Sequence, residues 1–240
     1  RKAKYTHPSP MLSLAKYQAT IDGIPPTELT EKWLNNIDAT EFDVTPKFDG
    51  NAANVIYTDG KLTQILSRGD GNKGRDITDK VKHNVPSEIN TKGIVEIRGE
   101  ICISANNFKT DKYSDFLNPR NAVAGILNSD EYSDDFINEL DFLPVDVRQT
   151  IDGETIYLET SNIKGLKHTS FKFDFNKGYD FNSIYDKMLN FREELTQYQL
   201  DGFVIKTEIS KRSSLGENSH DPNWAIAIKF PPKQAITKII

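Results

Sequence analysis

Residues 43–68 constrain the fold most strongly, because their pattern predicts two strands joined by a tight turn. The alternating runs NAANVIY and KLTQILSR flank Thr58-Asp59-Gly60. Asp-Gly between two such runs is a strong signal for a β-hairpin, since the turn requires positive φ angles that these residues tolerate. We therefore expect antiparallel strands, around which the other elements must fit.

A second segment, GIVEIRGEICIS at residues 93–104, alternates with period two and predicts another strand. Side chains alternate between the two faces of a strand, so this strand would have two chemically different faces. The apolar face would carry Val95, Ile97, Ile101 and Ile103, and the other face Glu96, Arg98, Glu100 and Cys102.

The rest of the chain mixes helical and strand patterns. Helical spacing is found at residues 25–37, 75–84, 118–128 (after a loop) and 180–197. Strand patterns are found at residues 140–147, 153–158, 200–208 and 223–230, whereas residues 1–30 are Pro-spaced and predicted to be largely irregular. This order predicts an α+β fold with mainly antiparallel sheets flanked by helices.

Composition limits the class of protein. The chain has 240 residues, enough for one large domain or two small ones, and its single cysteine, Cys102, excludes a disulfide framework and a thiolate metal cluster. No apolar run approaches the ~20 residues needed to span a bilayer, and no secretory segment opens the sequence, so we expect a cytoplasmic protein. The net charge of −5 disfavours a dedicated nucleic-acid binder but is compatible with a local basic face.

Two motif matches are weak. GDGNKG at residues 69–74 fits G-x-G-x-x-G, and Glu88 follows at a suitable distance, but the preceding strand belongs to a hairpin rather than to a βαβ unit. A turn that caps a helix is the better interpretation. The acidic run SDEYSDD at residues 129–135 lacks EF-hand spacing and is better explained as a solvated loop.

Three lysines inside apolar strands are more informative: Lys47 in KFDG, Lys206 in DGFVIKTE and Lys229 in WAIAIKF. Edge strands often carry lysines that prevent aggregation, and for one lysine that explanation is sufficient. Three of them, together with Glu100 and Arg98 on a polar strand face, favour a functional site.

The chemistry of an amine suggests what such a site does. A lysine is protonated at neutral pH and becomes a nucleophile when desolvation or nearby cations lower its pKa. Lys206 and Lys229 could supply those cations and could also stabilise charge on a phosphate. Asp49, expected on the same strand face as Lys47, could orient the amine or bind a sugar hydroxyl, and Glu100 could hold a hydrated divalent metal.

KFDG resembles the K-x-D-G motif of covalent nucleotidyltransferases. Six further segments resemble, in order, motifs of the adenylation domain of NAD-dependent DNA ligases: HPSPMLSL (7–14), SRGDGNKGRDIT (67–78), VEIRGEI (95–101), NPRNAVAG (118–125), LDGFVIK (200–206) and WAIAIKFP (224–231). The resemblance covers almost the whole chain. It implies the nucleotidyltransferase (ATP-grasp-like ligase) fold and covalent transfer of AMP from NAD, with Mg²⁺, to nicked double-stranded DNA in DNA repair and replication.

The resemblance also implies roles for individual residues. Lys47 would be the adenylylated nucleophile and Asp49 would bind near the ribose. The nucleotide would contact Ser13, Leu14, Arg68, Glu100, Lys206 and Lys229, with Glu100 tied to the ribose or the metal and the two lysines to the adenine pocket and the α-phosphate. Arg120 and Asp201 would serve later steps on nicked DNA, and further metal ligands are unknown.

Four positions depart from the family pattern. The family has Glu-Leu before the lysine, where this chain has Thr45-Pro46, and proline lacks the backbone donor that could read an adenine edge. In the family's F-x-x-Y-G strand the aromatic position aligns with Val145 of FLPVDV, and an expected arginine aligns with Asn128.

The resemblance assigns residues 1–231 to the adenylation domain and residues 232–240 to the start of a linker toward an oligonucleotide-binding domain. The family's clamp for nicotinamide mononucleotide, its oligonucleotide-binding domain and its helix-hairpin-helix domain are expected on a partner chain or on missing parts of a longer protein. An alternative is a non-catalytic or partner-dependent subunit of a split ligase that assists DNA binding. The intact Lys47, Asp49, Glu100, Lys206 and Lys229 favour the catalytic interpretation.

Overall fold

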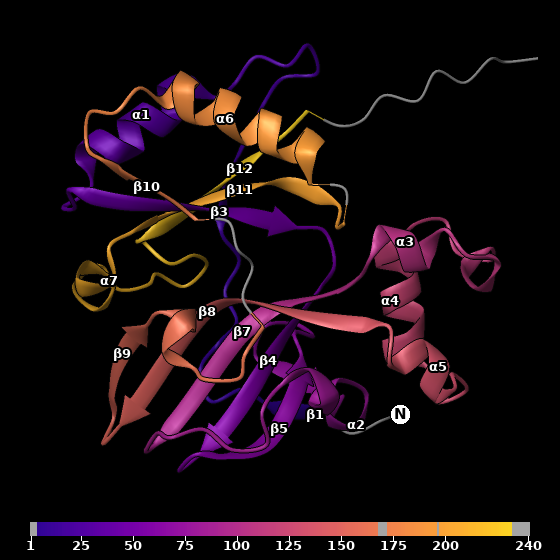
Figure 1. The fold of residues 1–240 in the computed structure, drawn as a ribbon. Coiled ribbons are helices and arrows are strands. Elements are labelled where there is room, and N and C mark those ends of the chain that lie inside the picture. Colours follow the sequence, from indigo (N-terminus) through magenta and orange to yellow (C-terminus); the bar gives the residue numbers. More distant parts are fainter. Residues whose placement is uncertain (1–3, 168–171, 196, 232–240) are drawn as a thin grey trace, which may run out of the picture.

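Two five-stranded sheets lie one above the other in the computed structural model, which describes residues 4–167, 172–195 and 197–231 (Figure 1). The upper sheet has the order β10-β3-β11-β12-β2 and the lower sheet the order β5-β4-β7-β8-β9. All pairs within these two sheets are antiparallel except β12–β2, which is parallel. The predicted α+β class with mainly antiparallel sheets is therefore confirmed.

The upper sheet consists of β2 (Ala15–Gln18), β3 (Glu41–Phe48), β10 (Phe173–Asn176), β11 (Leu200–Thr207) and β12 (Ala225–Lys229). The lower sheet consists of β4 (Asn51–Thr58), β5 (Lys61–Ser67), β7 (Ile94–Ile103), β8 (Leu140–Ile151) and β9 (Glu154–Leu158). A separate pair joins β1 (Lys4–Thr6) to β6 (Lys73–Arg75).

Helices cover the outer surfaces of this arrangement. Figure 1 shows α1 (Thr27–Asn36) and α6 (Phe181–Glu194) above the upper sheet, and α3 (Ala105–Phe108), α4 (Pro119–Asn128) and α5 (Asp134–Ile137) beside the lower one. The shorter α2 (Thr78–Val81) and α7 (Ile209–Leu215) complete the set, with 3₁₀ turns at Lys82–Asn84, Asp111–Tyr113 and Thr160–Asn162. No helix in the described ranges is long and apolar enough to cross a membrane.

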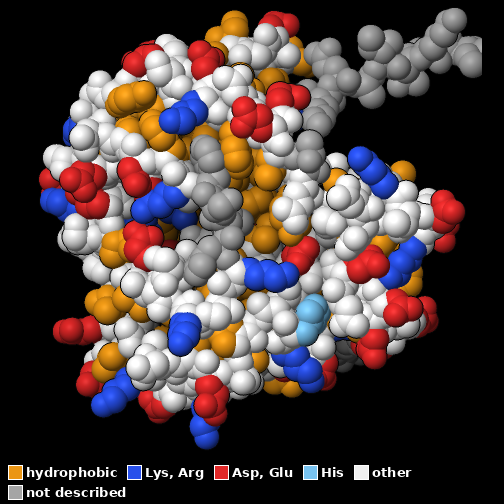
Figure 2. Space-filling model, viewed as in Figure 1, with side chains coloured by type: hydrophobic (Ala, Val, Ile, Leu, Met, Phe, Trp, Pro, Cys, Tyr) orange, Lys and Arg blue, Asp and Glu red, His pale blue; other side chains and the backbone are white. Residues whose placement is uncertain are grey.

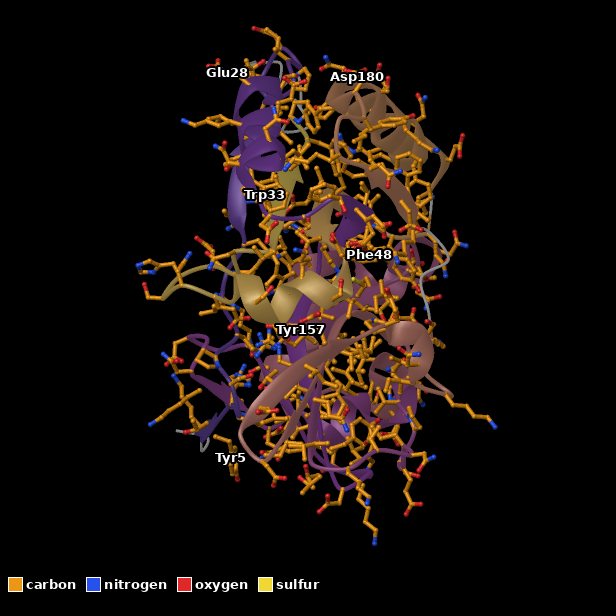
Figure 3. The ribbon with its side chains drawn as sticks, turned by 90° about the vertical axis from the view of Figure 1, so that its left-hand side faces the viewer. Tyr5, Glu28, Trp33, Phe48, Tyr157 and Asp180 are labelled. Atoms are coloured by element: carbon orange, nitrogen blue, oxygen red, sulfur yellow. The ribbon has the colours of Figure 1, made fainter. Side chains whose placement is uncertain are left out.

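Each sheet has its own apolar core. The core of the lower sheet includes Val55, Ile97 and Val123, all fully buried, and that of the upper sheet includes Val44, Phe181 and Met188, also fully buried. Trp33, labelled in Figure 3, lies on α1. Its ring packs against that of Phe42 in β3, with ring centroids 6.1 Å apart. Full burial of an aliphatic or phenylalanine side chain stabilises the fold by about 1.5–3 kcal/mol. Each sheet is therefore stabilised by the helices that bury its own core.

The predicted hairpin is confirmed for β4 and β5, where Asp59 and Gly60 take φ angles of 47° and 83°. Its predicted beginning was wrong, because residues 43–48 belong to β3 in the other sheet. The strand Ile94–Ile103 is confirmed as β7.

Several other expectations need correction. Most of residues 4–30 is irregular, as expected, but the short strands β1 and β2 also form there, and both are completed by distant partners. The helix expected at residues 75–84 is reduced to α2 and a 3₁₀ turn, and GDGNKG leads into β6 rather than into a helix. The expected linker at residues 232–240 and Thr196 of the expected helix at 180–197 lie outside the described residues.

On the face drawn in Figure 2, acidic and basic side chains are interspersed. That distribution matches the modest net charge of −5. Attraction of a polyanion to this face would therefore depend on a few placed cations rather than on a broad basic surface.

The chain crosses from the upper to the lower sheet immediately after Lys47. β3 ends at Phe48 and β4 begins at Asn51, so Asp49 lies in the crossing. The prediction that Asp49 shares a strand face with Lys47 was therefore wrong. A Cβ atom on Gly50 would lie 2.3 Å from the carbonyl oxygen of Ile101 and 2.7 Å from Sγ of Cys102. Only glycine allows β7 to approach this closely.

We expect Gly50→Ala to lower the free energy of unfolding by about 3 kcal/mol, the upper part of the range for overpacking, because the added methyl meets backbone. Urea denaturation of both proteins measures the difference. A loss below about 0.5 kcal/mol, the scale of a neutral surface change, would mean that the two sheets separate easily at this point.

Candidate active site

Lys47 and Lys229 lie on the same face of the upper sheet. In the pairing of β3, β11 and β12, Gly202 is opposite both lysines, so no side chain separates them. Both strands that carry these lysines, and β11 with Lys206, are interior strands of the sheet. The explanation that they are protective edge-strand lysines is therefore wrong.

Asp201 joins the two lysines. Its Oδ2 accepts a hydrogen bond from Nζ of Lys47 at 3.0 Å, and Nζ of Lys229 lies 3.2 Å from the same oxygen. Burial alone would raise the pKa of Asp201, but the two ammonium groups outweigh burial and lower it. The carboxylate is therefore ionised at neutral pH and fixes Lys47, although the sequence had associated Asp201 only with later steps.

Glu100 of the lower sheet faces the same region. Burial raises the pKa of its carboxyl to about 7, against the favourable charges of Lys47 and Arg120 and a hydrogen bond from the backbone of Gly50. Nearby, Nη1 of Arg120 donates to Oδ1 of Asp49 at 2.9 Å. Arg120 is held at the first turn of α4, whose cap residue Asn118 accepts a hydrogen bond from the N–H of Asn121.

The HPSPMLSL segment is fixed onto the lower sheet by polar contacts. The amide groups of His7 and Met11 donate to the carbonyls of Asn72 and Gly71, at 2.9 and 2.8 Å. Ser9 also donates to the buried carboxylate of Glu96.

This docking of HPSPMLSL extends toward the nucleotide-binding residues expected from the sequence. Nη2 of Arg98 donates to Ser9. Four residues further along the chain, Ser13 accepts a hydrogen bond from Nη2 of Arg68 at 3.1 Å. The docked segment therefore brings Ser13 and Arg68 together.

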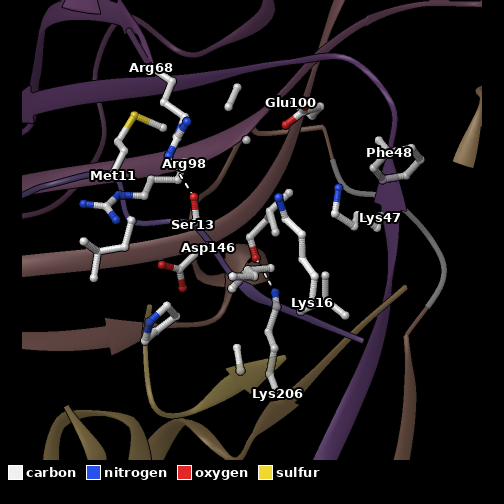
Figure 4. A pocket seen from close by; sticks show the side chains of 18 of the residues that line it. Met11, Ser13, Lys16, Lys47, Phe48, Arg68, Arg98, Glu100, Asp146 and Lys206 are labelled. Carbon is white, nitrogen blue, oxygen red and sulfur yellow. Dashed lines mark hydrogen bonds between the residues drawn. The ribbon is translucent and has the colours of Figure 1, made fainter. Parts of the chain in front are cut away.

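Between the sheets lies a cavity of about 290 Å³, close to the lower limit for small-molecule sites. Seven of the residues expected from the sequence line it: Ser13, Leu14, Lys47, Arg68, Glu100, Arg120 and Lys206. Figure 4 shows Lys47 and Glu100 toward one end and Asp146 and Lys206 away from them. The remaining expected residues, Asp49, Asp201 and Lys229, line a neighbouring groove of about 890 Å³, which also contains Arg120.

Lys206 lies at the wall of this cavity and is only 4% exposed. Burial lowers the pKa of its ammonium group, and Nζ donates to the carbonyl oxygen of Val145 at 2.7 Å. Val145 is the extra residue of a bulge, because Arg98 pairs with Asp146 and Gly99 with Pro144. Bulges of this kind are common beside active sites, where they redirect side chains.

Sequence reasoning missed other residues that line the cavity: Met11, Lys16, Asp146, Arg148, Glu217 and Trp224. Lys16 lies on β2, in a region expected to be irregular. Asp146 lies in the strand predicted at residues 140–147 and Arg148 directly follows that stretch in β8, and this charged pair beside apolar residues was the available signal.

The residues fit a hydrated magnesium ion only loosely. No group of three or more His, Cys, Asp or Glu side chains is arranged to hold a metal ion within the described part of the chain. Mg²⁺ usually keeps several waters and binds through one or two carboxylates plus substrate phosphates. Glu100 suits this arrangement, because burial and, to a smaller extent, the charge of Asp49 disfavour its ionised form, and a bound cation would favour that form again.

Comparison with known proteins is consistent over the whole chain. The family model described as "NAD-dependent DNA ligase adenylation domain" matches residues 2–233. A DNA ligase of Endomicrobium trichonymphae is 34% identical over 97% of this chain and 37% of its own length. A DNA ligase of Pelagibacter ubique is 34% identical over 99% of this chain and 36% of its own length.

The chain thus spans just over a third of the length of these relatives. Among solved structures, an RNA ligase of Naegleria gruberi resembles the chain remotely, with a TM-score of 0.46 and 13% identity over 95% of this chain and 58% of that one.

The pKa of Glu100 predicts how stability depends on pH. The unfolded carboxyl ionises near 4.5 and the folded one near 7, so the unfolded state loses its proton first. Stability from the neutral carboxyl is therefore present below about pH 4.5 and is lost as the pH rises to 7, by an amount on the order of 3 kcal/mol.

Glu100→Gln removes this titration, so the variant should gain stability relative to the wild type as the pH rises from 4.5 to 8. Urea denaturation at several pH values measures the gain, with the exposed Glu131→Gln as a control for the loss of one charge. A constant difference between Glu100→Gln and the wild type at all pH values would show that Glu100 ionises normally.

Proposed function

Because the chain belongs to the family of NAD-dependent DNA ligase adenylation domains, we propose that Lys47 attacks the α-phosphate of NAD and becomes covalently adenylylated. The observation that carries this proposal is the position of Lys47. Its amine lines a nucleotide-sized cavity and is fixed by the ionised Asp201, with Lys229 beside it. This is the arrangement that a lysine nucleophile and a developing phosphate charge require.

In the proposed step, a bond forms between Nζ of Lys47 and the α-phosphorus. The ammonium group must first give one proton to solvent to become a nucleophile. The bond from that phosphorus to the bridging oxygen then breaks, nicotinamide mononucleotide leaves with the electron pair, and the attacking nitrogen gives a second proton to solvent. Asp201 accepts a hydrogen bond from the amine and can orient it. Lys229 would stabilise the negative charge that grows on the phosphate oxygens in the transition state.

The other residues would bind and orient the nucleotide. Ser13 and Arg68, already hydrogen-bonded to each other, would contact the adenosine, as would Leu14. Lys206, at the wall of the cavity, would contact the adenine base. Glu100 would hold a hydrated Mg²⁺, which when bound would reduce the charge of the phosphates.

We further propose that AMP then passes to the 5′-phosphate of a nick in double-stranded DNA, after which the 3′-hydroxyl attacks and AMP leaves. The groove that contains Asp49, Arg120, Asp201 and Lys229 adjoins Lys47 and is the natural place for that phosphate. Domains outside these 240 residues would supply most of the grip on DNA, since the curated relatives are almost three times as long.

The alternative is a subunit that keeps the fold but only assists a partner in binding DNA. Two departures in the cavity wall favour it. Pro46 and Val145 both line the cavity, and neither offers the backbone donor or the aromatic face expected at these positions. The two functions differ in one measurable product, a lysine that carries AMP.

Lys47→Ala should abolish covalent labelling by NAD, because no other amine would be oriented toward the phosphate in the same way. Mass spectrometry of the intact protein and of its peptides measures the label. Lys16→Ala is the matched control, since this lysine also lines the cavity, and its label should remain on Lys47. A full label in Lys47→Ala would place the nucleophile elsewhere.

Lys229→Ala should slow adenylylation much more than it weakens binding of AMP. A group that meets charge as it develops contributes mainly to the transition state, and the loss of one such donor costs about 10²–10³-fold in rate. A time course of labelling and a titration with AMP give the two quantities. Equal losses in both would assign Lys229 to ground-state binding.

A further inference from the structure

A cluster of charged side chains, most of them buried, lies at the end of the cavity away from Lys47. Nη2 of Arg148 donates to Oε1 of Glu217 at 2.7 Å. Arg212 donates through Nη2 to Oδ1 of Asp43 at 3.0 Å and through Nε to the carbonyl of Thr207. These arginines thus make their hydrogen bonds to groups other than Asp146.

Asp146 lies among these cations without a hydrogen bond to its Oδ1 atom. The residue is 8% exposed, and Oδ1 is fully buried and has no hydrogen-bond partner. Nη1 of Arg212 lies 3.8 Å from Oδ1, and Nη2 of Arg148 lies 3.5 Å from Oδ2. The surrounding cations outweigh burial and lower the pKa of this carboxyl, so it is ionised.

A carboxylate at this place balances the charge of the arginines, but charge balance does not explain why Oδ1 of Asp146 lacks a hydrogen-bond donor. A buried carboxylate oxygen without a donor is costly, because it has given up hydrogen bonds to water. Asp146 also lines the cavity (Figure 4). Oδ1 itself has no exposed surface, but Oδ2 also accepts no hydrogen bond from the described residues, and a ligand in the cavity can supply a donor to it.

The geometry fixes which part of a nucleotide would reach Asp146. Along β3, Lys47 and Asp43 are four residues apart, or about 13 Å. Lys206 is directly opposite Asp43 on β11. A nucleotide with its α-phosphate at Lys47 therefore extends its base toward Lys206 and Asp146.

Lys206 and Asp146 together offer a donor beside an acceptor. The ammonium group of Lys206 has three donors, one of which is directed to Val145. Adenine presents the matching pair, an acceptor at N1 and a donor at its 6-amino group. Guanine and hypoxanthine present the reverse, because they carry a 6-oxo acceptor beside a protonated N1.

We propose that Oδ2 of Asp146 accepts a hydrogen bond from the 6-amino group of the bound adenine and so selects adenine over 6-oxopurines. Asp146 occupies the glycine position of the family's F-x-x-Y-G pattern, directly after Val145. Its carboxylate would supply base recognition on a wall where Pro46 and Val145 lack the groups that the family pattern has. This inference rests on the proposed function of the cavity.

The test compares AMP, IMP and purine riboside 5′-monophosphate, which carry an amino group, an oxo group and a hydrogen at position 6. Calorimetric titration of the full chain gives each dissociation constant. The wild type should bind AMP about 10–100-fold more tightly than IMP, the range for a hydrogen bond to a charged group, with the unsubstituted purine in between.

Asp146→Asn should reduce the AMP-to-IMP ratio to about 3-fold or less, because the amide can turn its N–H toward a 6-oxo group. Asp43→Asn is the matched control. It removes the same charge from the same ionic cluster, but Asp43 does not line this cavity, and the ratio should stay at the wild-type value. Circular dichroism checks that both variants fold.

A wild type that binds IMP and the unsubstituted purine as tightly as AMP would overturn the proposal, even if Asp146→Asn failed to fold. An unchanged ratio in a folded Asp146→Asn would overturn it as well. Labelling by NAD separates this inference from the proposed function. A wild type that becomes labelled on Lys47 without preferring AMP refutes the role of Asp146 alone. One that prefers AMP but is labelled neither by itself nor with an added domain that carries the nicotinamide mononucleotide clamp refutes the catalytic function alone.

Discussion

The close crossing of the chain at Gly50 sets the geometry on which the site depends. Lys47 belongs to the upper sheet, and within a few residues the chain has entered the lower one. The crossing allows no side chain at Gly50, because the backbone of β7 lies against it. The amine of Lys47 and the carboxyl of Glu100 therefore face each other from different sheets, and a bound phosphate would lie between them.

Placing a nucleotide site between two sheets requires many charges to be buried there. Isolated buried charges are very unfavourable, so each must have a partner of opposite charge. Asp201 with Lys47 and Lys229, and Glu217 with Arg148, meet this requirement within the protein. Glu100 and Asp146 meet this requirement only in part. Burial raises the pKa of Glu100, and the Asp146 carboxylate lacks a hydrogen-bond donor. Both residues line the cavity, as expected if a ligand completes them.

Sequence patterns predicted the elements that carry their own periodicity, and failed where distant partners decide the structure. The strands at residues 51–67 and Ile94–Ile103 were predictable, because alternation is a local property. The strands β1, β2 and β10 have three or four residues each and exist only through pairing with β6, β12 and β3. The crossing at Asp49 was mistaken for strand, since its cause is the approach of β7 and lies some fifty residues away.

The same distinction applies to the site. Residues that match family motifs were predictable one by one, and the structure brings seven of them around one cavity. Asp146 was not predictable in this way, because it stands where the family pattern has glycine, and its surroundings come from β7, β8, β11 and α7. The end of the cavity that we propose for the phosphate thus keeps the family's residues at Lys47, Glu100 and Arg120, while Val145 and Asp146, at the end proposed for the base, depart from the family pattern. A change in how the base is held leaves the reacting atoms in place, so base recognition can vary in this chain without loss of the chemistry at Lys47.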